Sequence, residues 1–473
     1  MPRKNISIDI RRAILLFLFM WALYGALTNL WDQYGYNLMH AGVESLAERG
    51  HFFLEGSETR KFSGLGENAP EAGGAIKNDV FWKGGHLYAV KHPGMFFLGA
   101  LVYKPLSILG VRYNREYNLA TSLVSWLTSG LLGALAVALL FLHSRANGLS
   151  LKPSLIIALS LGLSTIFFCY SGVLHHDFLT GCLLYFAARL IFGPASESDR
   201  RLSRYVFAGF LAGFAFTTSA LAFFFIAAFL VVIILSRDWR NLLNFFAGCI
   251  LGVMPLLIYN GACFGNPFLL PNAASGDQTV TMVFNLSVFR EKLSWYLMDP
   301  RSALWTFSPI LYIALIGHIS GALKKNRAAI LYLGGPFLLM FYVFFIPTFG
   351  GAQYGPRYIL PAIPLLCIGL IPVFQWLESE RENRKSQTAA RILIGLCFAA
   401  GITICFAGAV KGTMYGMDQH PFIFRLQTSL GLAGARRTPG PYPLVYPMIF
   451  LAAIIFYFLP FFREQTKTPS ERL

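Results

Sequence analysis

The segment that decides the fold reads FGGAQYGPRYILPAIP and covers residues 349–364. It places one arginine, Arg357, between two very apolar stretches, YLGGPFLLMFYVFFIP at 332–347 and ILPAIPLLCIGLIPVF at 359–374. A helix needs about 20 apolar residues to cross the hydrocarbon core of a bilayer. We therefore expect two neighbouring spans here, with Arg357 at the edge of the membrane between them.

The rest of the chain repeats this apolar pattern. Of its 473 residues, 55% are hydrophobic and 13% are charged, whereas a soluble protein carries about 25% charged residues. This composition predicts an all-α polytopic membrane protein. The apolar runs lie near 13–30, 94–110, 117–142, 154–173, 178–193, 205–219, 220–235, 243–261, 303–322, 328–347, 358–376, 391–410 and 444–462.

The positive charge supports a membrane topology and argues against a nucleic-acid partner. The net charge of +16 comes from basic residues scattered between the apolar runs, not from one basic patch. The run at 94–110 is short and carries Lys104-Pro105 in its middle. If it lies along the outer interface and does not span, every compact basic loop falls on one side of the membrane, which the positive-inside rule makes the cytoplasm.

This topology predicts about twelve transmembrane helices with both termini cytoplasmic. Residues 1–462 form one transmembrane domain in this interpretation, and 463–473 form a cytoplasmic tail. The first outer loop, 31–116, is too long and too polar to be a simple connector. We expect amphipathic helices in it at 33–50, QYGYNLMHAGVESLAERG, and at 94–110.

Cysteine and histidine usage predicts no metal site. The seven cysteines show no CxxC spacing and are read as small core residues. His175, His176 and Asp177 form a short outer turn, where adjacent ligands would point in different directions. Two interpretations remain for these residues: they cap the turn, or they form hydrogen bonds to a substrate. We expect no cofactor.

Two acidic residues of the first loop are candidates for chemistry. Asp32 follows the first apolar run directly. It could cap the next helix, or it could take a proton from a hydroxyl nucleophile at the mouth of a cavity. Asp79 is either a turn residue of a Gly-rich loop or a second acidic group of the site.

Several cations and aromatic residues at the outer edge suit a phosphate. Lys91 and His92 precede the run at 94–110, where Lys91 could snorkel or meet a phosphate at headgroup depth. Arg357 is flanked by Tyr354 and Tyr358. A guanidinium offers a rigid set of donors to phosphate oxygens, although snorkelling is the structural alternative.

These motifs together resemble a known family. GGAQYGPRYILPAIP resembles the Y-G-P-R-Y-L-L-P-A-L-P signature of bacterial membrane glycosyltransferases of the GT-C superfamily, in the protein O-mannosyltransferase and aminoarabinose-transferase branch. MDPRSALWTFSPILYIALIG at 298–317 resembles its P-x-x-G-L-x-x-x-S-P segment, with Ala303 in place of Gly. GHLYAVKHPG at 85–94 resembles its G-H-Y-Y-x-x-K-x-P-G stretch, and STIFFCYSGVLHHDF resembles its helix before an outer turn.

The resemblance implies a function and roles for residues. The donor would be a sugar linked to a polyprenyl phosphate, and an acceptor hydroxyl of a lipid, glycan or protein would displace the phosphate with inversion. The catalytic carboxylate would be Asp32, although Gln33 stands where the family often has a second acid. Arg357, Lys91, Arg301 and Arg115 would stabilise the leaving phosphate. The protein would act at the outer face of a bacterial inner membrane, towards the periplasm.

Two other classes of protein remain open. A transporter or flippase for a lipid-linked sugar or a small molecule would also have many helices and polar residues in the membrane. A non-catalytic scaffold would need neither the aromatic-flanked arginine nor the long outer loop. A cavity lined by both Asp32 and Arg357 would favour the enzyme, and a path across the midplane would favour the transporter.

Overall fold

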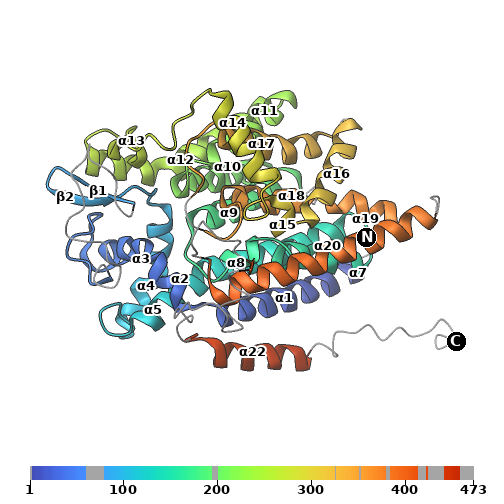
Figure 1. Cartoon of the computed structure of the whole chain (residues 1–473), viewed down its shortest axis with the longest axis horizontal. Helices are drawn as coiled ribbons and strands as arrows, with labels where there is room; N and C mark the ends of the chain where they lie inside the picture. Colours follow the sequence, from blue (N-terminus) through green and yellow to red (C-terminus); the bar gives the residue numbers. More distant parts are fainter. Residues whose placement is uncertain are drawn as a thin grey trace.

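The structure is a computed structural model that describes residues 3–59, 79–193, 201–324, 326–350, 353–379, 384–413, 422–423 and 442–458. Figure 1 shows a helical bundle that carries a small region of short helices and one hairpin at one end. The all-α prediction is confirmed for the bundle. The predicted tail at 463–473 lies outside the described residues, so the proposed domain limits stay a prediction.

The elements follow one another along the chain with short connections. In order they are α1 (Arg3–Ala26), α2 (Leu30–Gly35), α3 (Asn37–Glu44), η1 (Ser45–Arg49), β1 (Val80–Lys83), β2 (His86–Ala89), α4 (Gly94–Ile108), α5 (Tyr117–Ser125), η3 (Trp126–Gly130), α6 (Leu131–Ala146), α7 (Leu151–Leu163), α8 (Phe167–Tyr170), α9 (His176–Phe192), α10 (Arg201–Thr218), α11 (Ala222–Leu235), α12 (Trp239–Phe264), α13 (Pro271–Ser275), α14 (Leu286–Leu297), α15 (Leu304–Phe307), α16 (Ile310–Leu323), α17 (Arg327–Phe344), η4 (Arg357–Ala362), α18 (Ile363–Cys367), α19 (Leu370–Glu378), α20 (Arg384–Lys411) and α22 (Val445–Phe458).

Each predicted apolar run contains helix in the part that the structure describes. Within the described residues, five helical stretches are long and apolar enough to cross a membrane: 117–146, 239–264, 327–344, 357–378 and 384–411. Large apolar side chains on α12, α20 and α22 are exposed, as lipid-facing positions are: Ile258, Leu393 and Phe450 are 63%, 55% and 69% exposed. The chain is therefore a polytopic membrane protein. The count of about twelve spans and the interfacial placement of 94–110 stay predictions.

The described part of 31–116, which is predicted to be an outer loop, is more structured than its sequence predicts. Helix is present over most of 33–50, as expected, but every residue of α3 is buried, so the segment packs inside the outer region. An antiparallel hairpin of β1 and β2 follows, which the all-α prediction does not contain. Its turn is Gly84-Gly85, with φ of 58° and 82°. Two central residues with positive φ are typical of a tight hairpin turn.

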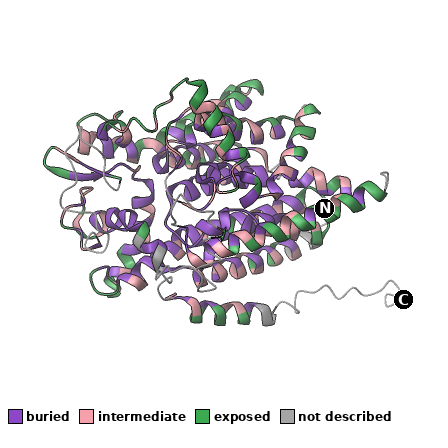
Figure 2. Cartoon of the chain, in the orientation of Figure 1, coloured by how far each residue is buried: buried purple, intermediate pink, exposed green. Residues whose placement is uncertain are grey.

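The buried core runs through the middle of the bundle. Figure 2 shows the buried residues concentrated around α8, α9 and α18 and the exposed residues on the outer helices. In α10 and α12 glycines recur every fourth residue and bring the two backbones together. A Cβ atom added at Gly209 would lie 2.0 Å from the carbonyl oxygen of Phe245, and one at Gly248 would lie 2.0 Å from that of Val206. This close packing fixes the end of α10 beside the site described next.

Candidate functional site

A polar cavity of about 410 Å³ lies where the outer loops meet the ends of α9, α10 and η4. Its walls carry both cations and carboxylates, which few membrane-embedded surfaces do. The charged and histidine residues that line it are Lys91, His92, His176, Asp177, Asp277 and Arg357. All but Asp277 are residues that the sequence singled out. Sequence segments 91–92, 176–177 and 357–358 therefore converge on one site.

Arg357 is the first residue of η4 and is 9% exposed. Its guanidinium carbon lies 5.0 Å from the centroid of the Tyr358 ring, and its Nε has no hydrogen-bond partner among the described residues. The backbone at Gly350 passes close by, since a Cβ atom there would lie 3.2 Å from that Nε. The glycine, at φ 92°, thus leaves room for the arginine. A buried donor without a partner is what an absent anionic ligand leaves behind.

Lys91 brings a second cation to the polar cavity. Its Nζ lies 3.2 Å from Oδ2 of Asp79, and this ammonium lowers the pKa of Asp79 below its ordinary value. Asp79 adopts φ 61°, which is uncommon for a residue with a side chain. Asp79 itself does not line the cavity. Its carboxylate forms the ion pair that holds Lys91 in position.

His92 is a neutral hydrogen-bond acceptor in this site. Its Nδ1 lies 2.9 Å from the carbonyl oxygen of Phe216, so Nδ1 must carry the proton because a carbonyl only accepts. Burial lowers the pKa of His92 to about 4. Its Nε2 has no hydrogen-bond partner among the described residues. A hydroxyl donor in the cavity would meet that nitrogen.

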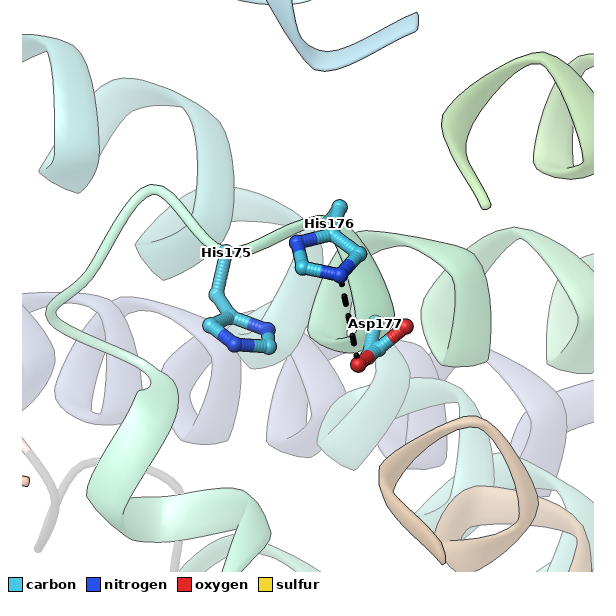
Figure 3. Close-up of side chains that lie close together, drawn as sticks. All are labelled: His175, His176 and Asp177. Atoms are coloured by element: carbon cyan, nitrogen blue, oxygen red, sulfur yellow. Dashed lines mark ion pairs between the residues drawn. The ribbon is translucent and has the colours of Figure 1, made fainter. Parts of the chain in front are cut away.

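The HHD turn at the start of α9 places Asp177 on the cavity wall. Oδ1 of Asp177 accepts a hydrogen bond from Oγ of Ser219 at 3.0 Å. Its Oδ2 lies 3.4 Å from Nε2 of His176, as the dashed line in Figure 3 marks, and has no hydrogen bond among the described residues. The stacked ring of His175, 4.6 Å from that of His176, does not line the cavity.

Asp32 lies behind this wall and not on it. It is fully buried, and its Oδ1 accepts hydrogen bonds from N and Oγ1 of Thr413 at 2.7 and 3.0 Å. The cap of α2 is Asn29, whose Oδ1 accepts from the N–H of Asp32 at 2.9 Å. The cap role considered for Asp32 is therefore wrong, because Asn29 fills it. Asp32 is not among the residues that line the polar cavity with Arg357.

Aromatic residues connect Asp32 to the polar cavity. The hydroxyl of Tyr36 lies 3.0 Å from Oγ1 of Thr413, and its ring meets the His175 ring edge-on at 5.4 Å. Burial, and secondarily the charge of Asp32, raise the pKa of Tyr36 well above its ordinary value. Tyr36 and His175 thus separate Asp32 from His176 and the cavity.

Beside the polar cavity lies an apolar one of about 610 Å³, between α14, α16, α17 and the η4–α18 segment. The short helix η4 contributes to both. Arg357 and Tyr358 line the polar cavity, and Ile359 and Ala362 line the apolar one. A ligand with a charged head and a long apolar tail could therefore bind across η4, with its head in the polar cavity and its tail in the apolar one.

Comparisons with known proteins agree on the architecture. The crystal structure of the Archaeoglobus fulgidus oligosaccharyltransferase in its apo form superposes with a TM-score of 0.52 at 12% identity, over 90% of this chain and 61% of that one. This chain therefore shares the fold of that archaeal protein. The chain spans about 61% of the length of that archaeal protein, and at this identity the similarity concerns the fold.

ArnT from Cupriavidus metallidurans bound to undecaprenyl phosphate superposes with a TM-score of 0.48 at 14% identity, over 97% of this chain and 76% of that one. No family model matches the sequence, and no curated protein matches it either. The superposition on the archaeal protein confirms the fold that the motif resemblance implies.

Three residues predicted for the GT-C donor site lie elsewhere in the structure. Arg301 pairs with Asp299, with Nη2 2.6 Å from Oδ2, and lines a different cavity. Arg115 is exposed before α5. Tyr354 is fully buried and donates its hydroxyl to the carbonyl of Ile404 at 2.6 Å. None of the three lines the polar cavity.

The sequence interpretation missed the neutral half of the cavity. Several hydroxyl and amide side chains from the end of α10, from α13 and from the loop after α13 line it beside Asp277: Thr218, Ser219, Asn272, Gln278 and Thr281. The available signal was the polar run NAASGDQT at 272–279, in an outer loop too long for a connector. Such groups suit the hydroxyls of a sugar or an acceptor.

His175, His176 and Asp177 could also bring ligand atoms to a metal ion. One ligand atom from each lies within 4.8 Å of the others, and all three residues are buried. Two imidazoles and a carboxylate are a donor set that suits Zn²⁺ and similar ions. The expectation of no metal stays a prediction.

Proposed function

We propose that the chain is an integral-membrane glycosyltransferase that uses a sugar linked to a polyprenyl phosphate and acts on the outer face of a bacterial inner membrane. The acceptor would be a lipid, glycan or protein of the cell envelope. One observation carries the proposal: η4 has Arg357 in a cavity with charged walls and Ile359 and Ala362 in an apolar one. This arrangement suits a phosphate that bears an apolar tail.

The donor would bind across η4. Its phosphate would meet Arg357 and Lys91, of which the first has an unpartnered Nε and the second is held by Asp79. Phosphate oxygens accept two parallel hydrogen bonds from a guanidinium, which fixes their orientation. The isoprenoid chain would lie in the apolar cavity, and the sugar would face Asp177, His92 and the hydroxyl-rich wall.

The reaction is a displacement at the anomeric carbon. The acceptor oxygen forms a bond to that carbon, and the bond from the carbon to the phosphate oxygen breaks. The electron pair stays on the phosphate, and the acceptor proton passes to a carboxylate. The configuration inverts because the acceptor attacks once, from the face opposite the phosphate. Negative charge grows on the phosphate as the bond breaks, and preorganised cations such as Arg357 and Lys91 can each contribute roughly 3–4 kcal/mol to the transition state.

We propose a carboxylate as the base and compare two candidates, since Oδ1 of the third nearby carboxylate, Asp277, accepts hydrogen bonds from Thr279. Asp32 is the residue that the family resemblance implies, but in the structure its oxygens are taken by Thr413 and Asn29. Asp177 lines the cavity with Oδ2 free of hydrogen bonds among the described residues. A base must come within hydrogen-bond distance of the proton it removes, so the geometry favours Asp177. We propose that neither phosphate binding nor proton removal requires a metal ion.

Arg357 variants test the donor site directly. Binding of undecaprenyl phosphate to the purified protein should weaken on the order of tenfold in Arg357→Ala, because a charge-assisted contact is lost. Arg357→Lys should recover part of it, since an ammonium lacks the fork. The matched control is Arg301→Ala, which removes an arginine outside the cavity and should bind as the wild type does. Equal binding by wild type and Arg357→Ala would overturn the donor site.

Transport of the lipid-linked substrate is the alternative outcome. A flippase would move a labelled polyprenyl phosphate across proteoliposome membranes without transferring a sugar. A transferase would release polyprenyl phosphate from the sugar-linked donor only when an acceptor is present. The two assays on the same preparation separate the proposals.

A further inference from the structure

A groove of about 580 Å³ lies at the opposite end of the bundle from the polar cavity, between α7, α19 and α20. The stretch 357–378 is a single candidate span that begins at Arg357 and ends at Glu378, and Glu378 lines the groove. If this span crosses the membrane, as the topology predicts, the groove and the polar cavity belong to opposite membrane faces. Figure 1 shows the three helices together at the end far from the hairpin.

The groove is apolar inside and cationic at its rim. Ile156, Phe374, Ile394 and Phe398 supply apolar lining from all three helices. The space at Gly395 is open, since a Cβ atom added there would meet no atom within 4 Å. An alkyl chain is the shape that such a lining accommodates.

Two cations line the groove, and neither forms an ion pair with a described residue. Lys152 and Arg391 are both exposed. Arg391 is held in place because its Nη2 donates to the carbonyl oxygen of Leu377 at 2.7 Å. The one carboxylate of the lining, Glu378, accepts hydrogen bonds from the backbone N–H and the hydroxyl of Ser150. The lining thus carries two cations against one carboxylate and is net positive.

We propose that this groove binds one anionic glycerophospholipid from the membrane leaflet opposite the active site. The acyl chain would lie on the apolar lining, and the headgroup phosphate would contact Lys152 and Arg391. Basic pockets between helices at a membrane surface recognise anionic headgroups in this way. A zwitterionic lipid is less suitable, because its ammonium group would meet the same two cations.

Native mass spectrometry of the full chain can test the proposal. The purified protein is incubated with equal amounts of phosphatidylglycerol and phosphatidylcholine of the same acyl composition. We expect the wild type to retain one phosphatidylglycerol in preference to phosphatidylcholine. The double variant Lys152→Ala/Arg391→Ala should lower that preference by about tenfold or more, since each basic residue at a membrane surface contributes roughly a fivefold gain.

Two further variants keep the test decisive. Lys152→Glu leaves the Arg391 hydrogen bond intact, so it should fold as the wild type does and still lose the preference. Gly395→Trp should fill the groove and lower retention of both lipids. The matched control is Lys324→Ala/Arg327→Ala, which removes two cations outside the groove and should keep the preference. Equal retention of the two lipids by the wild type, or an equal loss in the control pair, would overturn the proposal.

Discussion

Gln33 is an amide at the position where the family that this chain resembles often has a second acid. Its Nε2 donates to the carbonyl oxygen of Gly172 at 3.0 Å, and its Oε1 accepts from Oγ of Ser125 at 2.9 Å. The same Oε1 lies 3.0 Å from Nε2 of His40, whose pKa burial lowers to about 3. A glutamate could not donate to Gly172. The amide therefore links the segment that carries Asp32 to α5 and to the turn before α9.

Gln33→Glu should consequently destabilise the protein and not restore a second catalytic acid. It removes one buried hydrogen bond and buries a charge, and a buried group left without its partner costs about 1–3 kcal/mol, more when it is charged. The melting temperature should fall by several degrees, at roughly 2–4 °C per kcal/mol for a large domain. The matched control is Gln375→Glu, which removes a hydrogen bond to the carbonyl oxygen of Asn147 at an exposed glutamine. Because water can replace that partner, the melting temperature should fall much less.

Asparagine variants of the two carboxylates decide which one is the base. Asp177→Asn keeps the size of the side chain and cannot take a proton, so turnover should fall by a factor on the order of 10²–10⁴ while undecaprenyl phosphate still binds. Asp32→Asn should mainly weaken the contacts to Thr413 and lower the melting temperature. If Asp32→Asn is the inactive variant and Asp177→Asn turns over normally, the family-based assignment holds and the geometric one is wrong.

For single residues, the sequence predicted which side chains belong to the site better than it predicted the partners that they contact. Arg357, Lys91, His92 and Asp177 were identified by residue type and position at an outer edge, and the structure brings them to one cavity. Arg301 was chosen on the same grounds, yet it pairs with a neighbour two positions away. Side-chain partners of this kind depend on local backbone geometry, which the residue pattern does not specify.

Elements were predictable where their hydrophobic pattern was long. The apolar runs gave helices because a bilayer core leaves no other way to satisfy the backbone. The hairpin at 80–89 was not predicted, although VFWKGGHLYA has a two-glycine turn between β-favouring residues. The pairing of α10 with α12 was also missed, although both carry glycines four residues apart, at 209 and 213 and at 248 and 252. Small residues at this spacing let membrane helices approach closely.

Gly248→Ala tests the contribution of that helix pair. The new Cβ would lie 2.0 Å from the carbonyl oxygen of Val206, so α10 and α12 must move apart. Overpacking of this kind costs about 1–3 kcal/mol, and the melting temperature should drop accordingly. Gly395→Ala is the matched control, because a Cβ there meets no atom within 4 Å. Equal melting temperatures for the two variants would show that the helix contact contributes little.

The same variant should also affect the site, since α10 ends beside the polar cavity. Thr218 closes α10, and Ser219, which follows it, donates to Oδ1 of Asp177. A displaced α10 would move that donor. Turnover in Gly248→Ala should therefore fall at temperatures where the protein is still folded.

At the scale of the whole molecule, charge distribution predicts how the chain is oriented. Most compact basic segments are predicted on the side of the α6–α7 turn, and the hairpin and polar cavity on the other. The structure supports two distinct ends, since the α7–α19–α20 groove and Arg357 lie at opposite ends of one candidate span. It gives no membrane faces, so the orientation stays a prediction.

Accessible cysteines can test that orientation. Ser150 precedes α7 and His86 begins β2, and both are exposed. The native cysteines are buried or half-buried, so the wild type is the background control for a membrane-impermeant maleimide. In intact bacterial cells, permeabilised only at the outer membrane, His86→Cys should label and Ser150→Cys should not, because lysine and arginine loops stay in the cytoplasm. Ser150→Cys should label once the inner membrane is opened. Labelling of both variants from outside would mean that 94–110 spans the membrane, and the helix count and the outer location of the polar cavity would both have to be revised.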